Sequence, residues 1–70
     1  MTIGNRAAEA ILKTAIDKGI DFKDECARMD ITPKALSDWK VGKCDPCAYY
    51  LKIMCLSGYD IIYILTGEKK

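Results

Sequence analysis

Residues 24–39 decide the fold and read Asp-Glu-Cys-Ala-Arg-Met-Asp-Ile-Thr-Pro-Lys-Ala-Leu-Ser-Asp-Trp. Within this stretch, Thr32 and Pro33 are typical of a helix start, because threonine caps the first turn and proline fits the first helical position. An earlier helix is expected over about residues 22–29, which leaves about three residues for the turn between the two helices. A connection this short forces the helices to cross steeply.

The turn and the helices around it carry residues that suit a helix-turn-helix. Cys26 is small enough for the point at which the two helices touch. Asp30 falls where the turn needs a positive φ, a position at which glycine is usual and aspartate is tolerated at some cost. The turn and the second helix supply apolar anchors at the right spacing, namely Ile31, Leu36 and Trp39.

The sequence on either side predicts three further helices. Apolar residues recur at steps of three and four from Ile3 to Ile16, and Gly19 follows as a helix-ending residue. Capping residues indicate the other boundaries: Asp21 with Asp24 resembles a capping box at the start of residues 22–29, and Gly42 follows a helix that ends at Trp39 or Lys40. A fourth helix is expected to start at Asp45-Pro46, to reach Ser57 and to end at Gly58. A fifth, Ile61–Thr66, is expected between the cap Asp60 and Gly67. Since no stretch alternates as a strand does, we expect one all-α domain over residues 1–70, a compact five-helix bundle.

Composition excludes several classes of protein. With 70 residues, a large active-site cavity would consume much of the core. The chain has no histidine, which removes the commonest general base and the commonest metal ligand. Its longest apolar run, Ile61–Leu65, is far shorter than the ~20 residues of a membrane-spanning helix. We therefore expect no enzyme, no catalytic residue, no cofactor, no small-molecule substrate and no membrane partner.

Positive charge gathers in one window, although the net charge is only +1. Residues 34–43 contain Lys34, Lys40 and Lys43 against Asp38, so three positive charges minus one negative charge leave an excess of +2. The net charge alone does not indicate a nucleic-acid ligand, but this window coincides with the second helix of the steeply crossing pair.

From Asp24 onward the chain resembles the phage-repressor-like (lambda-repressor type) family of helix-turn-helix DNA-binding domains. Residues 24–39 are similar to the paired helices of the family. The W-x-x-G-x-x-x-P segment of the family is matched by Trp39-Lys-Val-Gly-Lys-Cys-Asp-Pro46. Its G-x-D-x-x-Y-x-L-T-G ending is matched by Gly58-Tyr-Asp-Ile-Ile-Tyr-Ile-Leu-Thr-Gly67. The resemblance implies a transcriptional regulator that inserts its third helix into the major groove of double-stranded DNA as a dimer. It also implies a cytoplasmic protein encoded by a bacterium or a phage, and the N-terminus does not read as a secretory signal.

If Leu36 and Trp39 point inward, the outward face of the third helix carries the candidate base contacts. These are Pro33, Lys34, Ser37 and Asp38. Lys34 would donate to guanine, Asp38 would accept from a cytosine amino group, and Pro33 would contact a thymine methyl group. Pro33 and Asp38 depart from the glutamine, serine, asparagine or arginine that family members often place there, and Asp38 also repels phosphate. The alternative is an ordinary solvated helix face.

Lysines near the two helices are the candidate phosphate contacts, which position a protein without reading sequence. They are Lys23, Lys40 and Lys43. Each of them is otherwise a solubilising surface residue. A second function therefore stays open: a module with the same fold that binds a protein and does not read DNA, as the near-zero net charge and Asp38 would permit.

The segment Cys44-Asp-Pro-Cys47 raises a third possibility, a metal- or thiol-controlled switch. Cys26 and Cys55 are the other thiols, and both are expected inside helices as small core residues. Without histidine and without a second knuckle, the pattern does not favour zinc. We expect no metal site and four reduced thiols.

The last expected helix is apolar around its circumference. Ile61, Ile62, Ile64 and Leu65 fill barely two turns and point in at least three directions, since successive residues rotate by ~100°. Ile61 and Leu65, four residues apart, are expected to face the core, which leaves Ile62 and Tyr63 for a second copy of the chain. A two-fold dimer would place the two third helices ~34 Å apart, as paired half-sites require.

Overall fold

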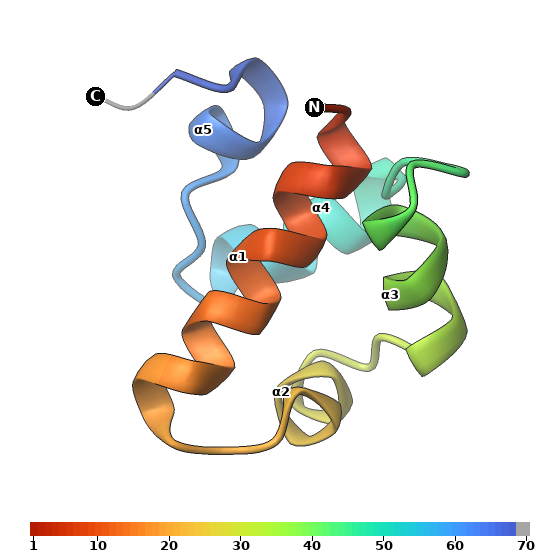
Figure 1. Cartoon of the computed structure of the whole chain (residues 1–70). Helices are drawn as coiled ribbons and strands as arrows, with labels where there is room; N and C mark the ends of the chain where they lie inside the picture. Colours follow the sequence, from red (N-terminus) through yellow and green to blue (C-terminus); the bar gives the residue numbers. More distant parts are fainter. Residues whose placement is uncertain (69–70) are drawn as a thin grey trace.

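The computed structural model describes residues 1–68, which form five helices and no strand (Figure 1). The helices are α1 (Ile3–Lys18), α2 (Phe22–Arg28), α3 (Pro33–Lys40), α4 (Ala48–Leu56) and α5 (Ile61–Thr66). The all-α class and the order of the five helices are confirmed. Over the described residues, no helix is long and apolar enough to cross a membrane.

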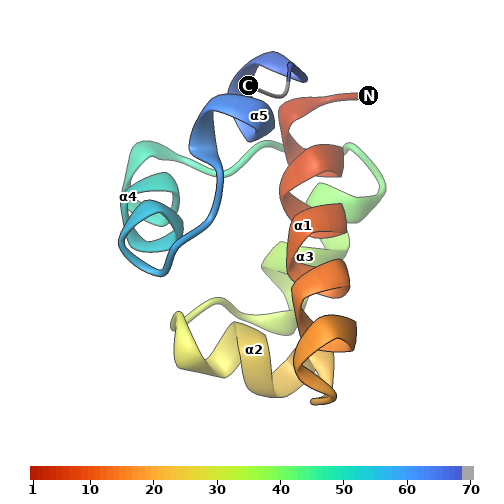
Figure 2. The same ribbon diagram turned by 90° about the vertical axis from the view of Figure 1, so that its left-hand side faces the viewer.

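Helix α1 is the element against which most of the others pack. It contacts α2, α3 and α5, and Figures 1 and 2 show it lying alongside these three helices. Its buried face carries Ala7, Ala8 and Ile11. Ile16, which the periodicity placed on the same face, is 78% exposed, and its neighbour Ala15 is the residue that α1 buries at this point.

The turn after α2 has the backbone that the sequence predicts. The N–H of Asp30 donates to the carbonyl of Ala27 (3.1 Å) and the N–H of Ile31 donates to that of Cys26 (2.8 Å). This pair of bonds ends a helix through a residue in the left-handed region, and Asp30 has a φ of 58°. The positive φ predicted for Asp30 is confirmed. Glycines with positive φ follow the other helices, at Gly19, Gly42, Gly58 and Gly67.

Helix α3 begins and ends as the sequence predicts. The side chain of Thr32 accepts the N–H of Ala35 (3.1 Å), and Pro33 occupies the first helical position. At the other end, the side-chain amide of Asn5, in the first turn of α1, donates to the carbonyls of Trp39 (3.1 Å) and Lys40 (2.9 Å). Asn5 therefore fixes the C-terminus of α3 to α1, a long-range contact that no local pattern indicates.

The predicted start of α4 at Asp45-Pro46 is wrong. Helix α4 begins at Ala48 behind Cys47, which makes no side-chain capping bond. The carboxylate of Asp45 instead accepts the N–H of Gly4 (2.8 Å), at the N-terminus of α1. Gly4 permits this approach, because a Cβ atom there would lie 2.5 Å from the carbonyl oxygen of Cys44.

Asp21 and Asp60 both cap their helices, but only Asp60 does so in the way that the sequence predicts. Asp21 caps α2 by accepting the N–H of Lys23 (3.0 Å), not by the capping box with Asp24 that its spacing resembles. Asp60 caps α5 as predicted, by accepting the N–H of Tyr63 (3.0 Å).

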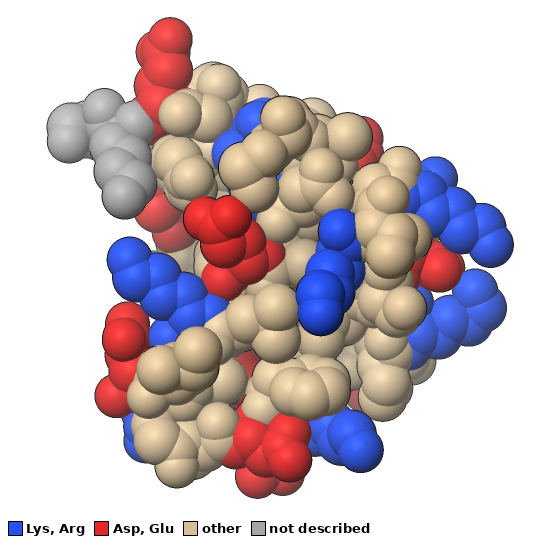
Figure 3. Space-filling model, in the orientation of Figure 1, with Lys and Arg blue, Asp and Glu red and all other residues tan. Residues whose placement is uncertain are grey.

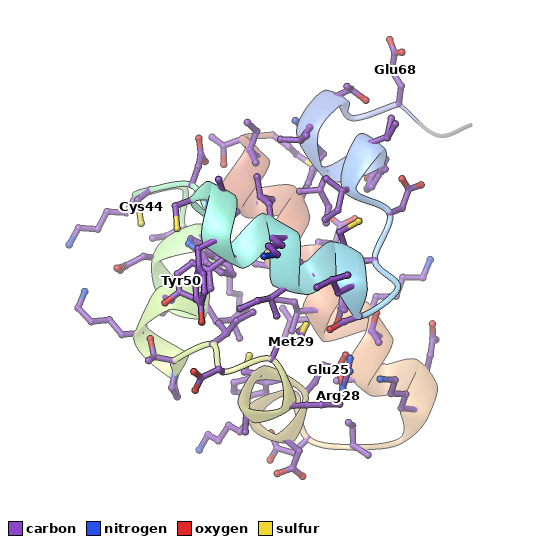
Figure 4. All side chains as sticks on the ribbon, turned by 180° about the vertical axis from the view of Figure 1, so that it is seen from behind. Glu25, Arg28, Met29, Cys44, Tyr50 and Glu68 are labelled. Atoms are coloured by element: carbon purple, nitrogen blue, oxygen red, sulfur yellow. The ribbon has the colours of Figure 1, made fainter. Side chains whose placement is uncertain are left out.

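The core confirms the three anchors predicted for the crossing helices. Ile31, Leu36 and Trp39 are all buried, and Cys26 is buried where α2 meets its neighbours. The ring of Trp39 meets the ring of Tyr50 edge to face, with centroids 5.3 Å apart; Figure 4 shows Tyr50 on α4. This contact joins α4 to α3, so the exposed face of α3 rests on a packed support.

Candidate nucleic-acid interface

The outward face of α3 carries the four predicted base-contacting residues. Pro33, Lys34 and Ser37 are exposed and Asp38 is half-buried, while Leu36 and Trp39 point into the core. The helical register predicted for α3 is therefore confirmed.

Two of these residues are paired with each other. The ammonium of Lys34 lies 3.0 Å from Oδ2 of Asp38, one helical turn further on. The side chain of Lys34 is 77% exposed and that of Asp38 is 22% exposed, so the carboxylate is the better-packed partner. Sequence reasoning treated the two side chains as separate contacts and missed this ion pair, although the spacing i,i+4 allows it.

The three candidate phosphate contacts surround this face. Lys23, Lys40 and Lys43 are exposed and make no ion pair among residues 1–68. Figure 3 shows Lys and Arg side chains along the right-hand edge, where α3 and the following loop lie in Figure 1. Because Lys34 is neutralised locally by Asp38, these lysines supply the net positive charge of this edge.

A hollow of about 280 Å³ lies where α2 begins beside α3. Three polar side chains line it, those of Lys23, Ser37 and Lys40. The rest of its lining is apolar and comes from Leu12, Phe22, Pro33 and Leu36. The structure thus places Pro33, Ser37, Lys23 and Lys40 around one depression, whereas Lys34 and Asp38 do not line it. Lys43 lies beyond the end of α3, where its backbone N–H donates to the carbonyl of Asp38 (2.9 Å).

A buried carboxylate, which the sequence did not single out, holds α2 in place. Glu25 is fully buried and accepts hydrogen bonds from Lys18, Arg28 and Tyr59 (Figure 4 shows Glu25 and Arg28). These partners come from α1, from α2 and from the segment before α5. A signal was present in the sequence, because Arg28 follows Glu25 at the i,i+3 spacing of a helical ion pair.

The charges around Glu25 set the protonation of the cluster. Hydrogen bonds from Arg28 lower the pKa of the Glu25 carboxyl from 4.5 to about 2; Tyr59 and Lys18 add to the lowering, and burial opposes it. Burial raises the pKa of the Tyr59 hydroxyl, and its hydrogen bond to Glu25 raises it further. The carboxylate therefore stays ionised at neutral pH and links α1, α2 and the chain before α5.

The cysteines occupy two kinds of place. Cys26 is buried, and burial raises the pKa of its thiol. Cys44 and Cys47 are exposed between α3 and α4, and Figure 4 shows Cys44 at the edge of the molecule. Cys55 is also exposed, so its prediction as a core residue is wrong: the buried residue in that stretch of α4 is its neighbour Met54. Among the described residues, no three histidine, cysteine, aspartate or glutamate side chains gather as metal ligands would.

The apolar surface of α5 differs from the prediction in one residue. Ile64 is buried, with Ile61 half-buried beside it, whereas Leu65 is 43% exposed. Of the two residues predicted to face the core, Ile61 packs against it as expected, whereas the prediction for Leu65 is wrong, and Ile64 is the fully buried residue of this helix. Arg6 helps to fix which side of α5 faces α1, because its guanidinium donates to the carbonyls of Ile64 (2.8 Å) and Leu65 (3.1 Å). These bonds tie the end of α5 to α1.

The exposed apolar residues of α5 form one small face. Ile62 is 49% exposed, as predicted for a residue left outside the core, and Leu65 follows at i+3 on the same side. Tyr63, the other predicted interface residue, is half-buried.

A wider hollow, of about 670 Å³, lies between α1 and the end of α3. Its lining includes three strongly exposed apolar side chains, those of Met1, Ile16 and Val41. Leu12 and Lys40 line both hollows, so the two depressions are neighbours on the surface shared by α1 and α3.

Comparison of the chain with models of known protein families, with curated proteins and with solved structures finds no match.

Proposed function

We propose that this protein is a sequence-specific, DNA-binding transcriptional regulator of the phage-repressor type. In this proposal α2 and α3 form a helix-turn-helix, and α3 enters the major groove of double-stranded DNA. One observation carries the proposal: the exposed polar face of α3 is surrounded by three lysines that make no ion pair among the described residues. The tight turn at Asp30 and the anchoring of both ends of α3 hold that face on a rigid support.

Residues on the outward face would read the bases. Lys34 can donate to guanine, Asp38 can accept from cytosine, and Ser37 can contact a base edge or a phosphate. Pro33, exposed at the start of α3, offers its ring to a thymine methyl group. Because Pro33 lies on the rim of the hollow beside α2, a methyl group there would also meet apolar surface.

The lysines around that face would contact phosphates. Lys23 lies at the start of α2, Lys40 at the end of α3, and Lys43 in the loop after it, so they frame α3 at both ends. Each phosphate neutralised contributes about −0.9 to the slope of log affinity against log salt concentration. Three contacts per chain therefore give a shallow salt dependence compared with strongly basic domains.

The proposed assembly is a two-fold dimer through α5. Its apolar face, with Ile62 and Leu65, is the surface that a second copy would cover. A half-site spacing of ~34 Å places each α3 ~17 Å from the axis. The largest dimension of the folded molecule, 27 Å, accommodates that distance, and Figure 1 shows α5 and α3 on opposite sides of α1.

A salt titration with fluorescently labelled duplex DNA tests the proposal. We expect wild-type binding to weaken as salt rises, and Lys43→Ala to flatten the slope by ~1 while weakening binding to all sequences evenly. Lys52→Ala is the matched control, because Lys52 is an exposed lysine on α4, outside the proposed interface. If Lys43→Ala and Lys52→Ala give the same slope, Lys43 does not contact DNA.

The wide hollow beside α1 favours a second candidate function, a protein-binding module of the same fold. Ile16 and Val41 are 78% and 72% exposed there, and exposed apolar clusters mark interaction sites. The same titration separates the two functions. A protein-binding module gives no DNA binding even at low salt, and Ile16→Asp then abolishes binding to its partner without affecting the fold.

A further inference from the structure

We propose that Lys34 and Asp38 act as one unit that reads a single G·C base pair in the major groove. The inference rests on the proposed function, because it assigns the base pair that α3 recognises. The observation behind it is the ion pair of 3.0 Å between the Lys34 ammonium and Oδ2 of Asp38, on the exposed face of α3.

Asp38 orients the lysine before any DNA is bound. Its side chain is 22% exposed against 77% for Lys34, so packing restricts the carboxylate more than the ammonium. Its backbone is held as well, since its carbonyl accepts the N–H of Lys43 (2.9 Å). A long lysine side chain loses much rotamer freedom when it binds a base, and an ion pair that already restrains it reduces that loss.

The hydrogen-bonding groups that the pair leaves available match the edge of a G·C pair. A lysine ammonium has three donors, so one used on Asp38 leaves two. A carboxylate has acceptor sites on both oxygens, so the second oxygen of Asp38 can still accept. In the major groove, guanine presents two adjacent acceptors, N7 and O6, and cytosine presents the N4 amino donor beside them. Two donors next to one acceptor therefore satisfy every polar atom on that edge.

The edge of an A·T pair fits the same unit less well. Adenine presents one acceptor, N7, followed by the N6 amino donor, and thymine presents O4 and a methyl group. Only one of the two remaining lysine donors then has an acceptor next to it, and O4 lies beyond the carboxylate.

The ion pair also reduces the repulsion between Asp38 and the phosphates of the DNA. Because Lys34 balances the negative charge of Asp38, this carboxylate repels the DNA backbone less than an isolated carboxylate would.

Selection from random duplex DNA with wild-type protein and with Asp38→Asn tests the inference. Asparagine offers a donor as well as an acceptor and pairs best with adenine N6 and N7. We expect wild-type sites to contain one position fixed as G·C, and Asp38→Asn to reduce discrimination against A·T at that position by about 5- to 150-fold. Discrimination at all other positions should stay the same. In a Lys34→Ala background, Asp38→Asn should not change the base preference at that position any further, although the loss of its negative charge should tighten binding to all sequences.

The control separates recognition from a simple change of charge. Asp24→Asn removes the same charge from an exposed aspartate on α2 and should tighten binding to all sequences without changing any preference. If Asp38→Asn behaves like Asp24→Asn, Asp38 acts only through its charge and the inference is overturned while the proposed function stands. If wild-type protein enriches no sequence and binds no duplex at low salt, the proposed function itself fails. The urea unfolding of each variant, followed by Trp39 fluorescence, verifies that its fold is intact.

Discussion

Protonation of Glu25 should cost the fold a measurable part of its stability. The lowering of its pKa from 4.5 to about 2 corresponds to at most about 3 kcal/mol. Two of its partners, Lys18 and Arg28, have side chains that are 45% and 43% exposed, so solvent screens part of this interaction. We therefore expect a contribution of about 2 kcal/mol, in a chain whose whole stability is about 4–10 kcal/mol.

The sign of the pH dependence follows from the lowered pKa. The folded state favours the ionised carboxylate, so the contribution is complete above the unfolded pKa of 4.5 and is lost as the pH falls from there toward 2. Glu25→Gln lacks the charge at every pH. Its free energy of unfolding should be about 2 kcal/mol below wild type at pH 7, and the difference should narrow steadily below pH 4.5.

Urea unfolding at a series of pH values measures this difference. The single tryptophan, Trp39, is buried and reports unfolding by fluorescence. Glu9→Gln is the matched control, because Glu9 is an exposed carboxylate on α1, and its substitution should change stability by less than about 0.5 kcal/mol. A difference between Glu25→Gln and wild type that is equally large at pH 7 and pH 2.5 refutes the electrostatic role assigned to Glu25.

Substitutions at three further positions test the packing, the helix cap and the assembly. Trp39→Ala should lower the free energy of unfolding by ~3–5 kcal/mol, because its buried ring packs on Tyr50; an unchanged melting temperature would contradict this burial. Asp45→Ala should cost ~1 kcal/mol through loss of the bond to the Gly4 N–H, and Asp45→Asn, which keeps an acceptor, should cost less; equal losses would show that the cap is not the cause. Ile62→Asp should give a folded monomer with much weaker DNA binding, whereas sedimentation of wild-type protein as a monomer that still binds tightly would exclude the dimer.

Local signals predicted most of the fold. Thr32-Pro33, Asp60 and Gly19 act within one turn of their own helix, and the structure has each helix boundary where they indicate. Asp30 could be recognised because few residues other than glycine adopt a positive φ at low cost. The burial of Leu36 and Trp39 followed from helical periodicity alone, which also oriented the candidate face of α3.

Contacts between distant residues could not be predicted in this way. Asp45 has the local appearance of a helix start, yet its carboxylate caps α1, 41 residues away in sequence. The assignment of Leu65 to the core failed for a similar reason, since the contacts of α1 with the end of α5 decide which side of that short helix is covered. Within the candidate site, the ion pair of Lys34 with Asp38 depends on rotamers that spacing permits but does not fix.

The central claim is that double-stranded DNA binds across α3, and amide chemical shifts test it most directly. In a titration of the labelled protein with a random-sequence duplex at low salt, we expect the shift changes to cluster in α3, at the start of α2 and in residues 41–43. Amides of α4 around Lys52 should change little. Changes confined to α1 and α4, or no changes at all, would contradict the claim.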